Sequence, residues 1–239
     1  MAAAAALALA GCGGGDEPRL VVSAASSMTE PLDDCSSDFE GADVRLSFAG
    51  SDELAAQIRK GLKPDVYAAA NTKLPDELNQ EGLLSRPVEF ATNELVIAVP
   101  PDSDVREAAD LARPGLKLVI GSESVPIGSY TREVLARLPG DEGERILANV
   151  RSNEPDVKGI VGKLTQGAAD AGFVYVTDVS AAGDSLRAVK LPAELEPDVR
   201  YAAGVVNGAK EPEKARDFVA GLRDGRCADA LAKAGFGAP

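Results

Sequence analysis

The stretch VVSAASSMTE, residues 21–30, joins a predicted strand to a predicted helix. Val21 and Val22 are apolar and β-branched, which is typical of a strand. The following residues are small or carry a hydroxyl, and no charge appears until Glu30, where a helix-like segment begins. Small neutral residues at the start of a helix allow a ligand to come close to the backbone and to its free N–H groups.

Strand and helix patterns alternate on the C-terminal side of this junction. Strands are predicted over 19–23, 43–50 and 65–70, and helices over 28–40, 52–62 and 74–82. This alternation predicts an α/β domain with a mostly parallel sheet. The next segment, 88–100, is too long and too rich in β-forming residues for a short parallel strand.

A second series of the same kind follows. Its predicted strands are 116–122, 150–153 and 171–176, its predicted helices are 127–138 and 155–164, and a long strand 199–207 precedes two helices at 211–223 and 226–235. Two series joined by two long strands predict two lobes, with the chain crossing between them near 84–90 and 200–207. We expect residues 19–85 and 206–239 in the first lobe and 86–205 in the second.

Composition limits the possible functions. Of the 239 residues, 45% are hydrophobic, which is enough for a packed core. The formal net charge is −13, which argues against nucleic acid or an anionic membrane surface as a partner. The chain has no histidine. This absence excludes histidine-dependent catalytic triads and histidine-ligated metal sites.

The N-terminus resembles an export signal. Its apolar run, MAAAAALALAGC, is too short to cross a bilayer as a mature helix, although the basic residues that usually begin a signal are missing. LAGC, residues 9–12, resembles the bacterial lipobox, in which Cys12 would be acylated, and GGGDEP would be a tether. We therefore expect residues 1–18 to be signal and tether of an exported cell-envelope lipoprotein. An Ala-rich disordered tail is the alternative.

Export would place the two other cysteines, Cys35 and Cys227, in an oxidising compartment where disulfides form. Their distance along the chain does not show whether they pair, and two buried free thiols are the alternative.

The junctions SAASSMT, FAGSDEL, SVPIGSY and NEPDVKG share one character, because each places small, hydroxyl or proline residues before a predicted helix. Ser51 occupies an expected N-cap position, and Pro126 and Pro155 occupy expected first helical positions. Helix N-termini favour anions, and ligands of α/β sheets bind at the carboxyl ends of the strands. The junctions therefore indicate an anion site, although each serine taken alone could simply be a cap.

Taken in order, VVSAASSMTEPLDD, RLSFAGSDELAAQI, PDVYAAANTKLPDEL, NELVIAVP, SVPIGSYTREVL and GFVYVTDV resemble the molybdate-binding proteins of bacterial ABC importers. The resemblance runs from about residue 19 to AKAGF near the C-terminus. It implies a type II periplasmic binding protein fold, α/β, with two lobes, a mixed sheet flanked by helices in each, and a two-strand hinge. It also implies a tetrahedral oxyanion, molybdate or tungstate, as ligand, and no cofactor.

The resemblance also implies a set of ligand-binding residues. The expected donors are two serine hydroxyls, two backbone N–H groups and one phenol, which fall on Ser27, Ser51, Ile127, Val157 and Tyr175. The family often has a smaller residue at position 127, which a backbone contact tolerates. Asn71 stands where the family often has Asp, and we interpret it as a supporting residue behind the site.

The same resemblance implies the remaining partners. The family topology returns the C-terminal helix to the helix that carries Cys35, so a Cys35–Cys227 disulfide is expected. The implied partners are the oxyanion, the membrane permease of an ABC transporter and the membrane through the lipid anchor. We expect a monomer that binds no nucleic acid.

Other functions fit the residues less well. A hydrolase with Ser27 or Ser51 as nucleophile would need Lys or a carboxylate as base, and no G-x-S-x-G motif is present. We expect no enzyme and no metal-ion site. Binding of tungstate, sulfate or phosphate remains open. Glu154 and Asp156 could be ligands, as carboxylates are in a related tungstate/molybdate group, but we interpret them as helix caps. No residue proposed for the site titrates between pH 6 and 8, so affinity should barely change there.

Overall fold

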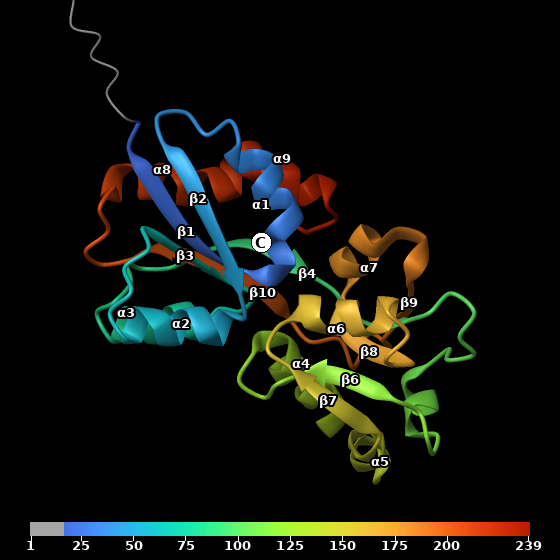
Figure 1. The fold of residues 1–239 in the computed structure, drawn as a ribbon. Coiled ribbons are helices and arrows are strands. Elements are labelled where there is room, and N and C mark those ends of the chain that lie inside the picture. The colour runs from blue at the N-terminus through green and yellow to red at the C-terminus, as the bar shows by residue number, and fades with distance from the viewer. Residues whose placement is uncertain (1–16) are drawn as a thin grey trace, which may run out of the picture.

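The computed structural model describes residues 17–239, and it contains two five-stranded mixed sheets with flanking helices (Figure 1). The predicted lipidation site, Cys12, and the signal segment lie outside the described residues. The α/β class with two lobes therefore agrees with the sequence pattern. We call the part built on the first sheet lobe 1 and the part built on the second sheet lobe 2.

The sheet of lobe 1 has the strand order β2-β1-β3-β10-β4. Its strands are β1 (Arg19–Ala25), β2 (Asp43–Ala49), β3 (Val66–Ala69), β4 (Val88–Asn93) and β10 (Val199–Val205). β1 pairs parallel to both β2 and β3, whereas β10 pairs antiparallel to β3 and β4. The carboxyl ends of β1 and β2 therefore meet at one edge, where the chain turns into helices.

Helices cover both faces of this sheet. They are α1 (Thr29–Ser36), preceded by the 3-10 turn η1 (Ser26–Met28), α2 (Ser51–Arg59), α3 (Lys73–Gln80), α8 (Pro212–Asp224) and α9 (Arg226–Lys233). β3 shows why both faces are covered, because its four residues are all buried and alternate between two clusters. Tyr67 and Ala69 pack in the cluster beneath α2 and α3, and Val66 and Ala68 pack in the main core.

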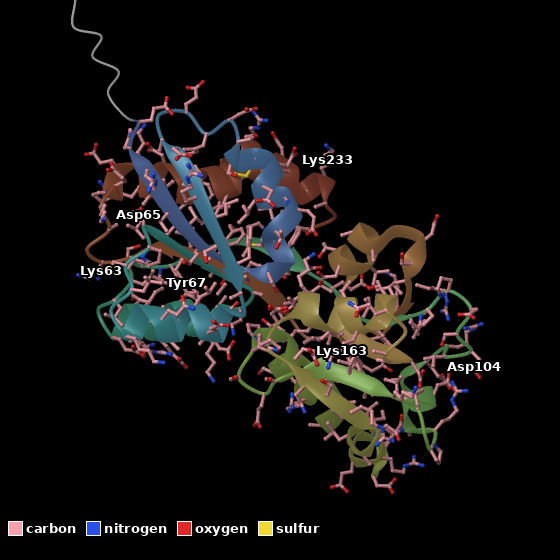
Figure 2. All side chains as sticks on the ribbon, viewed as in Figure 1. Lys63, Asp65, Tyr67, Asp104, Lys163 and Lys233 are labelled. Atoms are coloured by element: carbon pink, nitrogen blue, oxygen red, sulfur yellow. A yellow bond between two sulfur atoms is a disulfide. The ribbon has the colours of Figure 1, made fainter. Side chains whose placement is uncertain are left out.

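A disulfide joins Cys35 on α1 to Cys227 on α9, with the two Cα atoms 5.1 Å apart. The bond is visible in yellow between the two helices (Figure 2). The structure thus has the pairing that the family resemblance implied, and the C-terminal helix belongs to lobe 1.

The sheet of lobe 2 has the strand order β7-β6-β8-β5-β9. Its strands are β5 (Leu95–Val99), β6 (Leu118–Gly121), β7 (Val150–Glu154), β8 (Ala171–Tyr175) and β9 (Arg187–Lys190). β6 pairs parallel to β7 and β8, and β5 pairs antiparallel to β8 and β9. β5, β6 and β8 are buried at every position, as expected for strands with both faces covered.

Four α-helices accompany this sheet: α4 (Pro126–Ala136), α5 (Glu142–Ala148), α6 (Val157–Thr165) and α7 (Val176–Ala182), with short 3-10 turns η2 (Ala108–Ala112) and η3 (Gly183–Ser185). The sequence pattern predicted α4 and α6 but not α5, α7 or β9. Within residues 17–239, no helix has the length and apolar character needed to cross a bilayer.

The structure moves both crossings between the lobes. The predicted single strand 88–100 is two strands, β4 in lobe 1 and β5 in lobe 2, and the chain crosses at Glu94. The second crossing lies between Lys190 and Val199, because β10 pairs with β3 and β4 and so belongs wholly to lobe 1. Our boundaries at 85/86 and 205/206 were wrong for these two strands.

Candidate functional site

A small buried pocket with a cavity volume of about 10 Å³ lies between the two lobes. Its walls come from both lobes: Ala25, Ser26, Ser27, Ala49, Gly50, Ser51 and Ala70 from lobe 1, and Val125, Pro126, Ile127, Asp156, Val157 and Tyr175 from lobe 2. All five residues predicted to bind the ligand are in this set, and each of them is buried. The structure therefore brings together all five donor residues that the family resemblance implied.

Ser27 lies in the turn between β1 and α1 and is 4% exposed. Its Oγ is 3.0 Å from the hydroxyl of Tyr201 on β10, and the two form a buried hydrogen bond. The small residues on either side, Ala25 and Ser26, also line the pocket. The local sequence therefore leaves the serine hydroxyl and the adjacent backbone at the pocket wall.

Ser51 is the first residue of α2, and Gly50 is its N-cap. This corrects the expected N-cap role of Ser51. The Ser51 Oγ accepts a hydrogen bond from the backbone N–H of Ala70 at 3.1 Å, so its own hydrogen remains available to an acceptor. The backbone N–H of Ser51 has no acceptor within the helix, because it belongs to the first turn. Ser51 can therefore donate two hydrogen bonds.

Ile127 is at the N-terminal end of α4. Pro126 is the first residue of this helix, as predicted, and its missing N–H costs nothing at that position. The N–H of Ile127 is therefore the first backbone donor that the helix presents to the pocket, and it has no acceptor within the helix. The side chain plays no part in such a contact.

Val157 is the first residue of α6, and its N–H likewise has no acceptor within the helix. Pro155, expected at the first helical position, lies outside the helix. Asp156 is the N-cap, and its Oδ1 accepts from the N–H of Gly159 at 2.9 Å. Asp156 is thus a cap, as interpreted from the sequence.

Tyr175 ends β8, immediately before α7, and is 1% exposed. Within residues 17–239 its hydroxyl has no hydrogen-bond partner. Burial raises the pKa of this phenol well above its usual value, so it stays protonated and can donate. A buried hydroxyl without a partner is costly. An acceptor in the pocket would remove that cost.

The pocket wall carries no lysine or arginine. Behind Tyr175, the carboxyl of Asp178 accepts from the Tyr175 backbone N–H at 3.3 Å and lies 3.6 Å from the Nζ of Lys158. Burial raises the pKa of Asp178 to about 7, against the lowering effect of Lys158. The site therefore holds hydroxyl and N–H donors rather than cations, and one carboxyl near it titrates close to neutral pH.

Polar contacts of Lys158 and Ser124 are among those that join the lobes beside the pocket. Lys158 on α6 donates to both carboxylate oxygens of Glu30 on α1, at 2.7 and 2.8 Å. The hydroxyl of Ser124, before α4, donates to Asp52 on α2 at 2.5 Å. Because each pair has one member in either lobe, these contacts exist only while the lobes are together.

Two other residues considered in the sequence analysis do not line the pocket. Asn71 does not line it, and its Oδ1 accepts from the N–H of Leu74 at the start of α3. Glu154 is not a helix cap: its carboxylate pairs with Lys163 at 2.8 Å and also accepts from Ser152. Tyr201, Asn93 and Asp178 are the residues near the site that sequence reasoning missed, and no local motif marks them.

The site does not have the geometry of a serine hydrolase. The polar contacts of the Ser27 and Ser51 hydroxyls are a phenol and a backbone N–H. Burial raises the pKa of the Tyr201 phenol, so it stays protonated, and neither group can take a proton from the serine. No group of three or more metal-binding side chains occurs in the part of the chain that the structure describes.

Comparison with known proteins agrees with this geometry. A sequence model of the family described as "Bacterial extracellular solute-binding protein" matches residues 20–237. The "Molybdate-binding protein ModA" of Mycobacterium tuberculosis (strain H37Rv) is 35% identical over 227 residues, which cover 92% of this chain and 85% of the relative. These relatives are binding proteins and not enzymes, which agrees with the expectation from the sequence.

Solved structures share the fold. The periplasmic molybdate-binding protein of Azotobacter vinelandii superposes with a TM-score of 0.79 at 21% identity, over 92% of this chain and 99% of that one. The sulfate-binding protein SubI of Mycobacterium tuberculosis H37Rv superposes with a TM-score of 0.77 at 16% identity, over 92% and 86%. The chain therefore belongs to the bacterial extracellular solute-binding proteins, in the family of the molybdate-binding protein ModA.

Proposed function

We propose that this protein captures molybdate, and tungstate with similar affinity, outside the cytoplasm and delivers it to the permease of an ABC importer. The observation that carries the proposal is the pocket between the lobes, where neutral donors converge from both sides. These donors are the hydroxyls of Ser27, Ser51 and Tyr175 and the N–H groups of Ser51, Ile127 and Val157. The name of the relative at 35% identity adds the identity of the anion.

The donors supply enough free energy for tight binding without a cation. A hydrogen bond to a charged group contributes about 1.5–3 kcal/mol, so six such bonds contribute on the order of 10–20 kcal/mol before the cost of association, about 4 kcal/mol or more. An affinity between micromolar and nanomolar follows. Neutral donors also explain the absence of lysine and arginine from the pocket wall.

Size should decide the selectivity. The donors are held by helix starts in two lobes, so the closed cavity has one size and fits one metal–oxygen length. Molybdate and tungstate have nearly the same dimensions, whereas sulfate is smaller and cannot reach the donors of both lobes together. Losing two bonds costs about 3–6 kcal/mol, a factor of roughly 10² to 10⁴. Phosphate carries a proton near neutral pH, for which the six proposed donors offer no acceptor.

Calorimetric titration of the purified protein with molybdate, tungstate, sulfate and phosphate tests the proposal. Molybdate and tungstate should bind within about tenfold of each other, and sulfate and phosphate at least about a hundredfold more weakly. Sulfate binding as tight as molybdate would make this a sulfate-binding protein and would refute the proposed ligand. The similarity of fold to a sulfate-binding protein makes this the closest alternative.

The remaining parts of the proposal concern the cell envelope. Lipidation of Cys12 would tether the protein to the membrane, and closing of the lobes on the anion would create the surface that the permease recognises. Hinge motion would take place at the two crossings, at Glu94 and between Lys190 and Val199. Small-angle scattering should then show a smaller radius of gyration at saturating molybdate, and an unchanged radius would argue against closure.

A further inference from the structure

A buried chain of hydrogen bonds leads to the Ser27 hydroxyl from behind the pocket. The Tyr201 hydroxyl lies 3.0 Å from the Oγ of Ser27 and 3.4 Å from the Nδ2 of Asn93. Asn93 Nδ2 also donates to the Oγ1 of Thr177 at 2.9 Å. Tyr201 is fully buried and does not line the pocket, so it can affect a ligand only through its neighbours.

The direction of the bonds made by Asn93 follows from its amide group. Asn93 Oδ1 accepts from the backbone N–H of Glu94 at 2.9 Å, which only an oxygen can do, so the amide nitrogen faces Tyr201 and Thr177. Because that nitrogen can only donate, the Tyr201 oxygen is the acceptor. The single hydrogen of Tyr201 is then available to Ser27. Either hydroxyl can be the donor of the bond between them, and we take Ser27 Oγ as the acceptor. The hydrogen of Ser27 is left free for the pocket.

We propose that Tyr201 is a positioning residue for the oxyanion, which holds the Ser27 hydroxyl with its hydrogen directed at the ligand. The inference rests on the proposed function, because it assigns a role within the same site. A serine hydroxyl is otherwise a rotor that can donate in several directions. Fixing it before the anion arrives removes the cost of ordering it during binding.

The chain of hydrogen bonds also crosses the boundary between the lobes. Tyr201 and Ser27 belong to lobe 1, Thr177 belongs to α7 of lobe 2, and Asn93 is the last residue of β4, at the first crossing. The Asn93–Thr177 bond therefore fixes the orientation of the amide while the lobes are together. The same closure that brings the donors of lobe 2 to the anion thus orders a donor of lobe 1.

A double-mutant cycle measures this role directly. Tyr201→Phe removes the phenol hydroxyl and keeps the ring, and Ser27→Ala removes the group on which it acts. Molybdate affinity is measured by calorimetry for the wild-type protein, both single variants and the double variant. A loss of about one ordinary hydrogen bond predicts that Tyr201→Phe weakens binding by roughly 3- to 10-fold. In the Ser27→Ala background the same change should alter affinity less than about twofold.

Tyr67→Phe is the matched control. Tyr67 is as buried as Tyr201, but its hydroxyl donates to the backbone carbonyl of Ser51 at 2.8 Å, and not to a hydroxyl. Tyr67→Phe should therefore change the molybdate affinity by the same factor in the wild-type protein and in the Ser27→Ala variant, whether that factor is large or small. This control separates coupling to Ser27 from a general loss of a buried phenol.

The outcomes are distinct. Wild-type protein that binds none of molybdate, tungstate, sulfate and phosphate refutes the proposed function. Wild-type binding that Tyr201→Phe leaves unchanged overturns the positioning role alone. An equal loss from Tyr201→Phe in both backgrounds also overturns it, because the residue would then act through the fold and not through Ser27.

Discussion

Gly50 lies beside the pocket, where the backbones of the two lobes are close together. A Cβ built on this residue would lie 2.3 Å from the carbonyl oxygen of Pro155, across the boundary between the lobes. The backbone of Gly50, with φ −60° and ψ 137°, suits any residue. The Cβ would also lie 2.8 Å from the Oδ1 of Asp52 in lobe 1, the end of a side chain that can turn away. Gly50→Ala should therefore be tolerated within lobe 1 and should act mainly against closure.

The size of the effect follows from the distance. Real Cβ atoms essentially never lie within 3.0 Å of a non-bonded heavy atom. The carbonyl oxygen of Pro155 must therefore move away by about 0.7 Å. Val157, two residues beyond Pro155, would move with it, and a donor distance of about 2.9 Å would become about 3.6 Å, which is no longer a hydrogen bond. Loss of that bond alone costs about 1.5–3 kcal/mol, so molybdate should bind roughly 10- to 150-fold more weakly.

Calorimetry gives the affinity and thermal unfolding gives the stability of the ligand-free protein. The stability should stay within about 1 kcal/mol of wild type, because losing a glycine N-cap and restricting the unfolded chain have opposite effects. Gly221→Ala is the control, since a Cβ at Gly221 in α8 meets nothing within 4 Å. Its affinity should equal that of wild type. If Gly50→Ala also binds within threefold of wild type, our reasoning about closure is wrong.

Four further changes test the site and the fold. Ser27→Ala and Tyr175→Phe should each weaken molybdate binding by roughly 10- to 150-fold in calorimetry, and unchanged affinity in both would remove them from the site. Because the pKa of Asp178 is about 7 when folded and about 3.9 when unfolded, the folded protein binds this proton more tightly. Its contribution to stability should therefore fall as pH rises from about 4 to about 7. In denaturant unfolding, the free energy of unfolding of Asp178→Asn should rise by a few kcal/mol relative to wild type as pH increases across that range. A difference that stays constant with pH would contradict the raised pKa of Asp178. Reducing the Cys35–Cys227 bond should lower the unfolding free energy by about 2–5 kcal/mol but leave molybdate affinity unchanged, and a large loss of affinity would show that the bond shapes the pocket.

The alternation of strands and helices was predictable because each element carries its own period of apolar residues. The prediction went wrong over 88–100, where β-forming residues continue through Glu94 although the chain passes from one sheet to the other. Local periodicity reports that a segment is extended and does not report which sheet it joins. The same limit placed β10 in the wrong lobe, since its pairing with β3 and β4 is set by residues far away in the sequence.

The candidate site was predictable where it consists of helix starts, because small, hydroxyl and proline residues leave a local signature there. Tyr201 had no such signature: its partner Ser27 lies 174 positions away. Asp178 follows β8 in the first turn of a helix, where an exposed acid is ordinary, and only the fold makes it 2% exposed. Its pKa of about 7 adds a group behind Tyr175 that titrates between pH 6 and 8, although Asp178 is not one of the residues proposed for the site.

A net charge of −13 and a dianionic ligand are compatible because the two act over different distances. Exposed charges are screened beyond a Debye length of about 8 Å at physiological salt, whereas hydrogen bonds act on contact. Lys158, the lysine beside the pocket, is already engaged with Glu30 and Asp178, so it adds little attraction for an anion. Added salt should therefore strengthen molybdate binding slightly, by screening the repulsion of the whole chain. Calorimetry between about 50 and 500 mM sodium chloride checks this sign, and a tenfold loss of affinity with salt would mean that a cation holds the anion after all.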